Sequence, residues 1–170
     1  VLPPARKLCP AAVLIAVCDA PGGARVILTK RSSRLKHHPG QIALPGGKID
    51  TGDGGPEAAA LREAQEEVGL APSSVRVLGR LPAHETVTGY SVTPVLGHVR
   101  DVFFPIPEEG EVEEIFMVPL DFLMTPAHYR VEKRLWRGDW RRYYAVPFGP
   151  YYIWGATARI LRGMCDRLVP

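Results

Sequence analysis

The distribution of apolar residues along the chain predicts strands first and helices at intervals. An unbroken apolar run from Ala11 to Val17 predicts a buried strand over residues 11–18. Residues 25–30 have the composition of a second strand, joined to the first by the turn Pro21-Gly22-Gly23. A long loop is expected from Arg31 to Gly47. The chain is therefore expected to begin with a hairpin that leads into a loop.

Further along the chain, the pattern predicts more strands and two helices. Valine and threonine enrichment indicates strands at 74–81, 83–88 and 91–99. An acidic loop from Glu111 runs into a strand ending near Leu120, and residues 134–144 resemble a hairpin around Gly138-Asp139. Helical periodicity occupies residues 56–68 and 154–168. We find no repeat or linker, and we expect an α/β protein with helices covering a mixed sheet.

Length and composition fit one domain spanning residues 1–170. A chain of 170 residues that is 46% hydrophobic can bury one substantial core. Its cysteines are odd in number and form no C-x-x-C pair, which argues against a disulfide framework or a structural zinc site: Cys9, Cys18 and Cys165. A reducing compartment is expected.

No segment has the length of a membrane span. The longest apolar run is far shorter than the ~20 residues that cross a bilayer, and it lacks the basic flank and cleavage signature of a signal peptide. We therefore expect a cytoplasmic protein without a membrane partner. Because the chain begins at Val1 rather than at methionine, the sequence leaves open a preceding segment.

One predicted helix concentrates carboxylates on a single face. Glu63, Glu66 and Glu67 stand at positions i, i+3 and i+4, so their side chains converge within one turn. Each like-charge pair destabilises an isolated helix by roughly 0.2–0.5 kcal/mol. Divalent cations would turn this repulsion into coordination, and hard cations such as Mg²⁺ prefer oxygen ligands. The helix is therefore a candidate metal-binding element.

An ordinary solvated acidic face is the alternative for any glutamate-rich helix. Here the opposite face carries a predicted core stripe: Leu61, Ala64 and Val68. Pro56 suits the first turn, and Gly69 suits a left-handed cap at the end. Just upstream, Gly46 and Gly47 let the backbone approach a metal or phosphate closely. These surroundings favour the metal site.

The segment Arg62-Glu63-Ala64-Gln65-Glu66-Glu67-Val68-Gly69-Leu70 resembles the second half of the Nudix box, with alanine at an aliphatic position. The first half departs from that box. Lys48 stands where the box has its first glycine, and Gly54 stands where it has its early glutamate, so the loop from Gly47 is one residue longer. Asp53 or Glu57 is available to replace the early glutamate.

A second motif resembles the segment upstream of the box in coenzyme A pyrophosphatases. It runs from Ile27-Leu28-Thr29-Lys30-Arg31-Ser32 through Lys36 and Gly40 to Leu44-Pro45-Gly46-Gly47, and every spacing fits. Three positions carry similar rather than identical residues: Ile27 for leucine, Lys36 for arginine and Leu44 for phenylalanine. Two later segments also resemble this subfamily: Gly89-Tyr90-Ser91-Val92-Thr93-Pro94 and Ile153-Trp154-Gly155-Ala156-Thr157-Ala158-Arg159-Ile160-Leu161.

The resemblance implies a Nudix fold, a mixed sheet sandwiched between helices, and Mg²⁺ or Mn²⁺ as cofactor. It implies metal ligands at the main-chain carbonyl of Gly46 and at the carboxylates of Glu63, Glu66 and Glu67. Arg62 is expected to orient a neighbouring glutamate through a bidentate pair. A base or late metal ligand is expected from the acidic stretch 108–114, with Glu111 preferred; a solvated acidic loop is the alternative.

Substrate recognition is expected from Arg31, Arg34 and Lys36, because coenzyme A carries a 3′-phosphate besides its diphosphate. The alternative is that Arg31 pairs with a carboxylate and Arg34 is simply exposed. Tyr90 and Trp154 could stack on adenine or fill the core. The expected reaction is metal-dependent hydrolysis of coenzyme A, free, oxidised or acylated, to 4′-phosphopantetheine or its derivative and 3′,5′-ADP.

Two other functions stay open. The glutamate helix does not distinguish coenzyme A from ADP-ribose, a dinucleoside polyphosphate or a capped RNA end. A single-strand nucleic-acid-binding module is suggested by net charge +3 and by arginines interleaved with aromatics: Arg134, Arg137, Arg141 and Arg142 with Trp136, Trp140, Tyr143 and Tyr144. The small charge excess and the acidic helix argue against stable nucleic-acid binding. A structural hairpin explains that segment equally well. The sequence does not reveal the oligomeric state.

Overall fold

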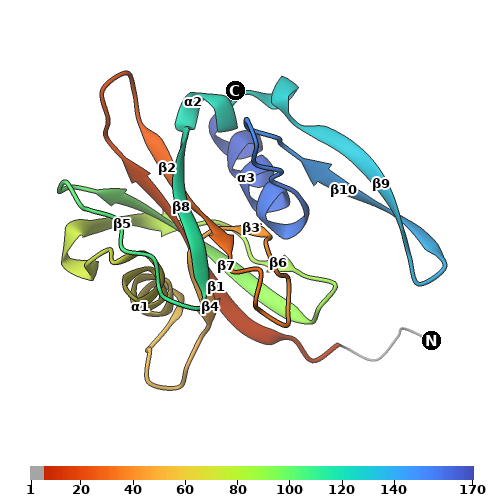
Figure 1. The fold of residues 1–170 in the computed structure, drawn as a ribbon, viewed down its shortest axis with the longest axis horizontal. Helices are drawn as coiled ribbons and strands as arrows, with labels where there is room; N and C mark the ends of the chain where they lie inside the picture. The colour runs from red at the N-terminus through yellow and green to blue at the C-terminus, as the bar shows by residue number, and fades with distance from the viewer. Residues whose placement is uncertain (1–5) are drawn as a thin grey trace.

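The computed structural model describes residues 6–170 and contains one large mixed sheet (Figure 1). Its main path is β3-β2-β1-β7-β5, with β4 paired to β1, β6 to β7 and β8 to β2. Strands β1 and β7 are parallel along their whole length, whereas β2 and β5 are antiparallel to their neighbours. The strands are β1 (Cys9–Cys18), β2 (Arg25–Arg31), β3 (Ile42–Ala43), β4 (Gly46–Lys48), β5 (Val75–Arg80), β6 (His84–Glu85), β7 (Tyr90–Val99) and β8 (Val112–Pro119).

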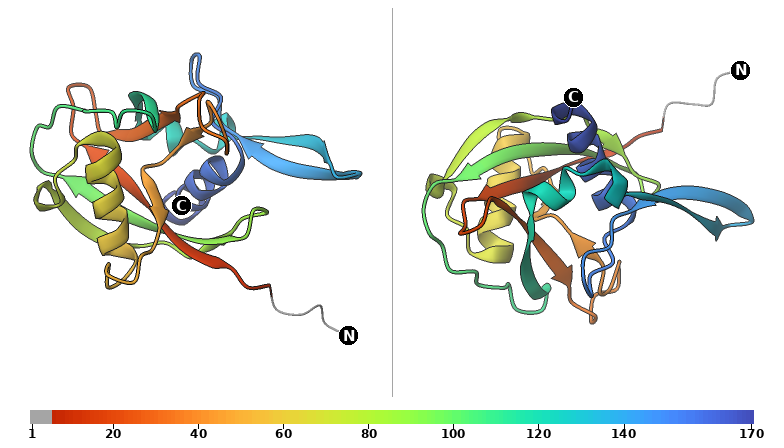
Figure 2. Two further views of the ribbon diagram at one scale, coloured as in Figure 1. Left: turned by 60° about the horizontal axis from the view of Figure 1, so that its bottom comes forward. Right: turned by 90° about the horizontal axis from the view of Figure 1, so that it is seen from above.

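Strand β1 separates two hydrophobic cores. Its even-numbered residues face helix α1 (Pro56–Val68), and its odd-numbered residues face helix α3 (Gly155–Leu168). Leu14 and Ile15 are thus both fully buried, on opposite faces. A strand covered on both faces needs apolar residues at every position, which accounts for the unbroken run in the sequence. The helices lie on opposite sides of the sheet (Figure 2), so the predicted α/β sandwich is confirmed.

Both predicted helices are confirmed, and α1 has the expected ends. Pro56 occupies the first turn, and Gly69 has φ 75°, with its N–H directed at the carbonyls of Ala64 and Gln65. Three shorter helical segments are also present: η1 (Pro72–Ser74), α2 (Leu120–Leu123) and η2 (Pro126–His128). No helix within residues 6–170 is long and apolar enough to cross a bilayer.

Four details differ from the prediction. The strand expected at 83–88 is reduced to the two residues of β6, because only His84 and Glu85 pair with β7. The expected loop of residues 31–47 contains β3 and leads into β4, because backbone pairing with β2 and β1 imposes extended structure on a glycine-rich segment. The strand expected before Leu120 begins at Val112, and Leu120 itself starts α2. The hairpin is longer than residues 134–144. Pairing with strands distant in sequence sets the bounds of β3 and β4, and local composition carries little signal of it.

Strands β9 (Arg130–Trp136) and β10 (Asp139–Ala145) form a separate two-stranded sheet that projects from the body (Figure 1). We call residues 130–145 the arm. Trp136 pairs with Asp139, so the turn consists of Arg137 and Gly138. Both turn residues have positive φ, 49° and 83°, as a type I′ turn requires.

Candidate active site

The carboxylates of α1 differ in their surroundings. Glu66 is exposed, whereas Glu63 and Glu67 are partly buried where the helix meets β4. Burial raises the pKa of Glu63, although neighbouring Arg62 opposes the shift. The pKa of Glu67 rises to about 8, chiefly because the carboxyl is buried and secondly because Glu63 repels its charge. The ionised forms of Glu63 and Glu67 are therefore unfavourable in this environment, and a nearby cation would stabilise them.

Arg62 connects α1 to the preceding loop. Its Nε and Nη2 donate to both oxygens of Asp53, at 2.7 and 3.0 Å. Its Nη1 donates to Glu63 at 3.1 Å and to Glu66 at 3.4 Å. The bidentate partner is thus Asp53 rather than the neighbouring glutamate expected from the sequence, while both glutamates receive single bonds. Arg62 fixes the direction of two carboxylates from one guanidinium.

Of the two acids that could replace the early glutamate, Asp53 contacts Arg62 and Glu57 does not. The guanidinium of Arg62 holds the pKa of Asp53 below its usual range, helped by the backbone N–H of Asp50. Glu57 instead forms an ion pair with Arg80. Of the two acids that could replace the early glutamate of the box, Asp53 therefore occupies the position beside Arg62. Sequence spacing alone did not distinguish them.

The glycine turn fits closely against the glutamates. A Cβ added to Gly47 would lie 2.6 Å from Oε1 of Glu63, and one on Gly46 would collide with the backbone of β1. The backbone N–H of Gly46 donates to the carboxylate of Glu67 and lowers its pKa against the effect of burial. Only glycines allow the backbone to come this close to two carboxylates.

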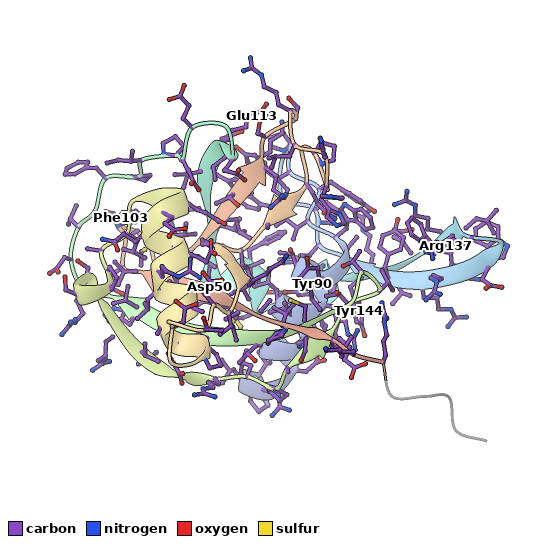
Figure 3. The ribbon with its side chains drawn as sticks, turned by 90° about the horizontal axis from the view of Figure 1, so that it is seen from below. Asp50, Tyr90, Phe103, Glu113, Arg137 and Tyr144 are labelled. Carbon is purple, nitrogen blue, oxygen red and sulfur yellow. The ribbon has the colours of Figure 1, made fainter. Side chains whose placement is uncertain are left out.

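A cavity of about 260 Å³ joins the two motifs. It lies between β1, β2, β4, β7 and the end of α1, and it is lined in part by four of the predicted site residues: Arg31, Gly46, Glu67 and Glu111. Tyr90 also lines it and lies inside the body between α1 and the arm (Figure 3). Much of the remaining wall is apolar, including Val13 and Leu44. The cavity therefore combines charged groups at one side with an apolar wall.

Three candidates lie neither on α1 nor in the wall of the cavity. Arg34 and Lys36 are exposed on the loop after β2, outside the set of residues that line the cavity. Trp154 caps α3 at the base of the arm, where its ring contacts Tyr143 edge-on at 5.2 Å and lies beneath the guanidinium of Arg134. Trp154 therefore packs against the base of the arm and does not line this cavity, whereas Tyr90 does.

Arg31 has an unused donor in the site. Its Nη2 donates to the carbonyl of His37 at 3.3 Å, but its buried Nε–H has no hydrogen-bond partner among the described residues. Both Arg31 and Glu67 line the cavity, and the positive charge of Arg31 lowers the pKa of Glu67 against the larger effect of burial. A buried N–H without an acceptor is unfavourable by roughly 1–3 kcal/mol. An anionic ligand in the cavity would satisfy it.

The segment that contains the acidic stretch 108–114 is joined to the end of α1 by backbone hydrogen bonds. The N–H groups of Ile106 and Glu108 donate to the carbonyls of Val68 and Glu67, at 2.9 and 3.0 Å. Glu108 therefore lies near the glutamate face of α1, where burial, Glu111 and Glu66 raise its pKa. The sequence placed Glu108 in a candidate acidic stretch but did not single it out, because only this backbone contact brings it close.

Within residues 6–170, no three histidine, cysteine, aspartate or glutamate side chains meet closely enough to form a ready-made metal cluster. Arg62 draws Glu63 and Glu66 toward itself, while Glu67 turns toward Gly46. The donor set nevertheless fits a hard cation, because carboxylate oxygens lie beside a glycine backbone that has no Cβ in the way. Burial of these carboxylates makes a nearby positive charge favourable. A cation would have to compete with Arg62 for two of the glutamates.

Comparison with known proteins decides the family. The NUDIX domain family model matches residues 8–136, more than half of the chain. The chain belongs to the Nudix family. A Citrobacter koseri protein described as an uncharacterized Nudix hydrolase, NudL, is 44% identical over 154 residues, covering 89% of this chain and 79% of the relative. Its Escherichia coli K12 counterpart is 42% identical over 152 residues, with the same shares covered.

Solved structures have the same fold. A Nudix hydrolase from M. smegmatis, RenU, has 29% sequence identity and a TM-score of 0.57, covering 66% of this chain and 71% of that one. The NUDIX domain of Shewanella oneidensis NrtR, solved with ADP ribose, has 16% identity and a TM-score of 0.58, covering 95% and 89%. This Nudix protein is therefore a hydrolase of the diphosphatase type, and such enzymes generally use divalent metal ions and small nucleotide substrates.

Proposed function

We propose that this Nudix hydrolase cleaves coenzyme A, free, oxidised or acylated, to 4′-phosphopantetheine or its derivative and 3′,5′-ADP. One observation carries the proposal: a single cavity is lined both by the glycine turn and glutamate of the Nudix box and by Arg31 of the upstream motif. That upstream motif is the part of the sequence that resembles coenzyme A pyrophosphatases. Its position in the cavity supports a role in substrate recognition.

Glu63, Glu66 and Glu67 would hold Mg²⁺ or Mn²⁺ together with the main-chain carbonyl of Gly46. The bound metal would neutralise charge on the diphosphate and acidify the attacking water. Arg62 orients Glu63 and Glu66 from its own anchor on Asp53. This arrangement keeps two ligands directed toward the same side of α1 before the metal binds.

Glu111 is our candidate for the group that takes a proton from the attacking water. It lines the same cavity as Glu67, and its backbone carbonyl accepts a hydrogen bond from the N–H of Ser32 at 2.9 Å, which fixes the segment. Water oxygen then forms a bond to one phosphorus while the bridging P–O bond breaks. Glu108 is the nearest alternative, because its charge already interacts with Glu66.

The three basic residues have different tasks in this proposal. Arg31 interacts with Glu67 inside the cavity, so we assign its free Nε–H to the diphosphate rather than to the 3′-phosphate. Arg34 and Lys36 are exposed on the adjoining loop, where they can meet a 3′-phosphate outside the cavity. A planar guanidinium suits the diphosphate, and a flexible ammonium suits a phosphate near solvent.

Product chromatography tests the proposal. The protein is incubated with coenzyme A, ADP-ribose or a dinucleoside polyphosphate, each with Mg²⁺, with Mn²⁺ and with chelator. We expect 3′,5′-ADP from coenzyme A in the presence of metal alone. Cleavage of another diphosphate with coenzyme A left intact would keep the Nudix chemistry and reject this substrate, whereas turnover undiminished by chelator would reject the metal assignment.

A further inference from the structure

The arm exposes apolar side chains far from the cavity. Cross-strand pairing places Val131 opposite Tyr144, and Leu135 opposite Trp140, on one face of the ribbon. Val131, Leu135 and Trp140 are 60%, 55% and 71% exposed. A two-stranded ribbon without a packed face is marginally stable in water. Leu135 and Trp140 therefore form an exposed apolar pair near the tip. The charged pair Lys133 and Arg142 separates them from Tyr144, which packs against the core.

The same ribbon is strongly basic. Residues 130–145 contain six arginines and lysines against two carboxylates, an excess of four positive charges, whereas the whole chain carries +3. Two cross-strand pairs set like charges directly opposite each other, Lys133 with Arg142 and Arg134 with Arg141. Such pairs destabilise a ribbon unless an anionic partner lies beside them. The two pairs fall on opposite faces, so positive charge surrounds the ribbon.

The turn adds a further cation at an unfavourable position. Arg137 has φ 49°, a conformation that favours glycine or asparagine and is unfavourable for other residues by roughly 1–2 kcal/mol. Its guanidinium lies 5.5 Å from the ring centre of Trp136, and that of Arg134 lies 5.9 Å away. Arg137 stands at the far end of the arm (Figure 3). The tip therefore places Trp136 and Arg137 together, although asparagine would adopt the backbone conformation of residue 137 at a lower cost.

We propose that the arm is a peripheral docking element for an anionic lipid surface, with its tip at the level of the headgroups. Tryptophan is favoured at a membrane interface, and each basic residue near an anionic leaflet adds attraction. Both edges of the ribbon have free backbone groups, so the strands must stay hydrated and the contact must be shallow. This departs from the expectation of no membrane partner, which rested on the lack of a spanning segment.

Two features favour lipid over a nucleic-acid strand. Leu135, next to the tip, gains from an apolar layer but offers no stacking surface to a base, and Trp136 already has guanidinium groups beside its ring. Basic side chains on both faces of the ribbon can contact lipid headgroups all around the tip. A nucleic-acid strand would follow only one face of the ribbon. The arm also projects beyond the body, as contact with a flat surface requires (Figure 2).

Vesicle sedimentation of the full chain tests the proposal. We expect binding to phosphatidylcholine vesicles that contain phosphatidylglycerol, weakened by salt, and little binding to phosphatidylcholine alone. Arg137→Asn keeps a residue suited to the turn and should weaken binding roughly fivefold; Arg141→Gln should do the same. Trp140→Ala should weaken it further. Phe104→Ala, which removes an equally exposed aromatic outside the arm, should bind like the parent.

Folding and activity are followed in parallel by thermal unfolding and diphosphate turnover. The arm variants should leave turnover at the parental level, and their melting temperatures should be parental or, where turn strain or a like-charge pair is relieved, higher. Equal binding to neutral and anionic vesicles, or parental binding by all arm variants, would overturn the proposal. So would preferential, arm-dependent binding of a single-stranded RNA oligonucleotide, or a stable dimer whose formation buries Trp140 and prevents vesicle binding. None of these readouts depends on coenzyme A being the substrate.

Discussion

The glutamate helix and the arm place charge in opposite structural settings. On α1, every charged side chain near the cavity has a structural contact: Arg62 binds Asp53, Glu63 and Glu66, while Glu67 accepts from Gly46. On the arm, cations face cations across the strands, and tryptophan is left exposed. The side chains of the first region already have contacts within the chain, among which the proposed metal would bind. The charges and the exposed tryptophan of the second region would gain a partner only from outside the chain. Substitutions in the two regions test this contrast, from the largest expected effect to the smallest.

Glu67→Gln should lower kcat about 10³-fold, because it removes one charged metal ligand while keeping the side-chain shape. The melting temperature should stay level or rise, since the parental carboxylate is buried and its pKa of about 8 already reflects the strain of ionisation. Steady-state kinetics and thermal unfolding measure both effects. A folded variant with parental kcat would refute the metal assignment.

Arg31→Ala should lower kcat about 10²-fold for both coenzyme A and dephospho-coenzyme A, because its free Nε–H is assigned to the diphosphate that both share. Lys36→Ala is the matched control. It should raise KM about fivefold for coenzyme A and leave dephospho-coenzyme A unaffected, because only coenzyme A has the 3′-phosphate. A selective loss on coenzyme A in the Arg31 variant would move this residue to the 3′-phosphate.

Gly47→Ala should reduce turnover about tenfold at limiting metal. The new Cβ would meet the end of the Glu63 side chain at 2.6 Å and push this ligand aside, but a flexible side chain can move, so the fold should survive. A titration of activity against Mg²⁺ measures the effect. Parental metal dependence in the variant would mean that Glu63 is not a ligand.

Gly138→Ala is the counterpart on the arm. Gly138 has φ 83° and open space where a Cβ would lie, so the substitution should destabilise the turn by about 1 kcal/mol through backbone strain alone. Hydrogen exchange should quicken in residues 130–145, while turnover stays parental. Slower turnover would show that the arm and the cavity are coupled.

Trp140→Ser should have the smallest effect, within about 0.5 kcal/mol of unfolding free energy, because the ring is mostly exposed. Chemical denaturation measures this quantity. A large loss of stability would mean that the arm packs against something in solution, and light scattering would then show whether that partner is a second copy.

The sequence predicted the elements whose signal is local. The apolar run of β1 marks a buried strand, and Pro56 and Gly69 mark the two ends of α1. In both cases the signal comes from residues within the element itself. Strand β4 escaped prediction because its extended form comes from pairing with β1, and its glycines have little strand preference. Local residue chemistry predicts an element only where the element does not depend on a distant partner.

The candidate site divides in the same way. Helical spacing predicted that Glu63, Glu66 and Glu67 share a face, because the period of a helix fixes that geometry. Sequence could not tell Asp53 from Glu57 as the partner of Arg62, nor separate Arg31 from Arg34 and Lys36. Those distinctions depend on the paths of two loops in space. The metal and substrate roles of all these residues remain predictions for the experiments above.

The parallel pairing of β1 with β7 also bears on how the chain folds. Cys9 meets Tyr90 and Cys18 meets Val99, so the central strand waits for a neighbour about eighty residues further along. Contacts of such long sequence separation slow folding, because a large loop must close before they form. During synthesis, one edge of β1 therefore stays open until the residues of β7 have left the ribosome. This interval is when the protein is most exposed to aggregation.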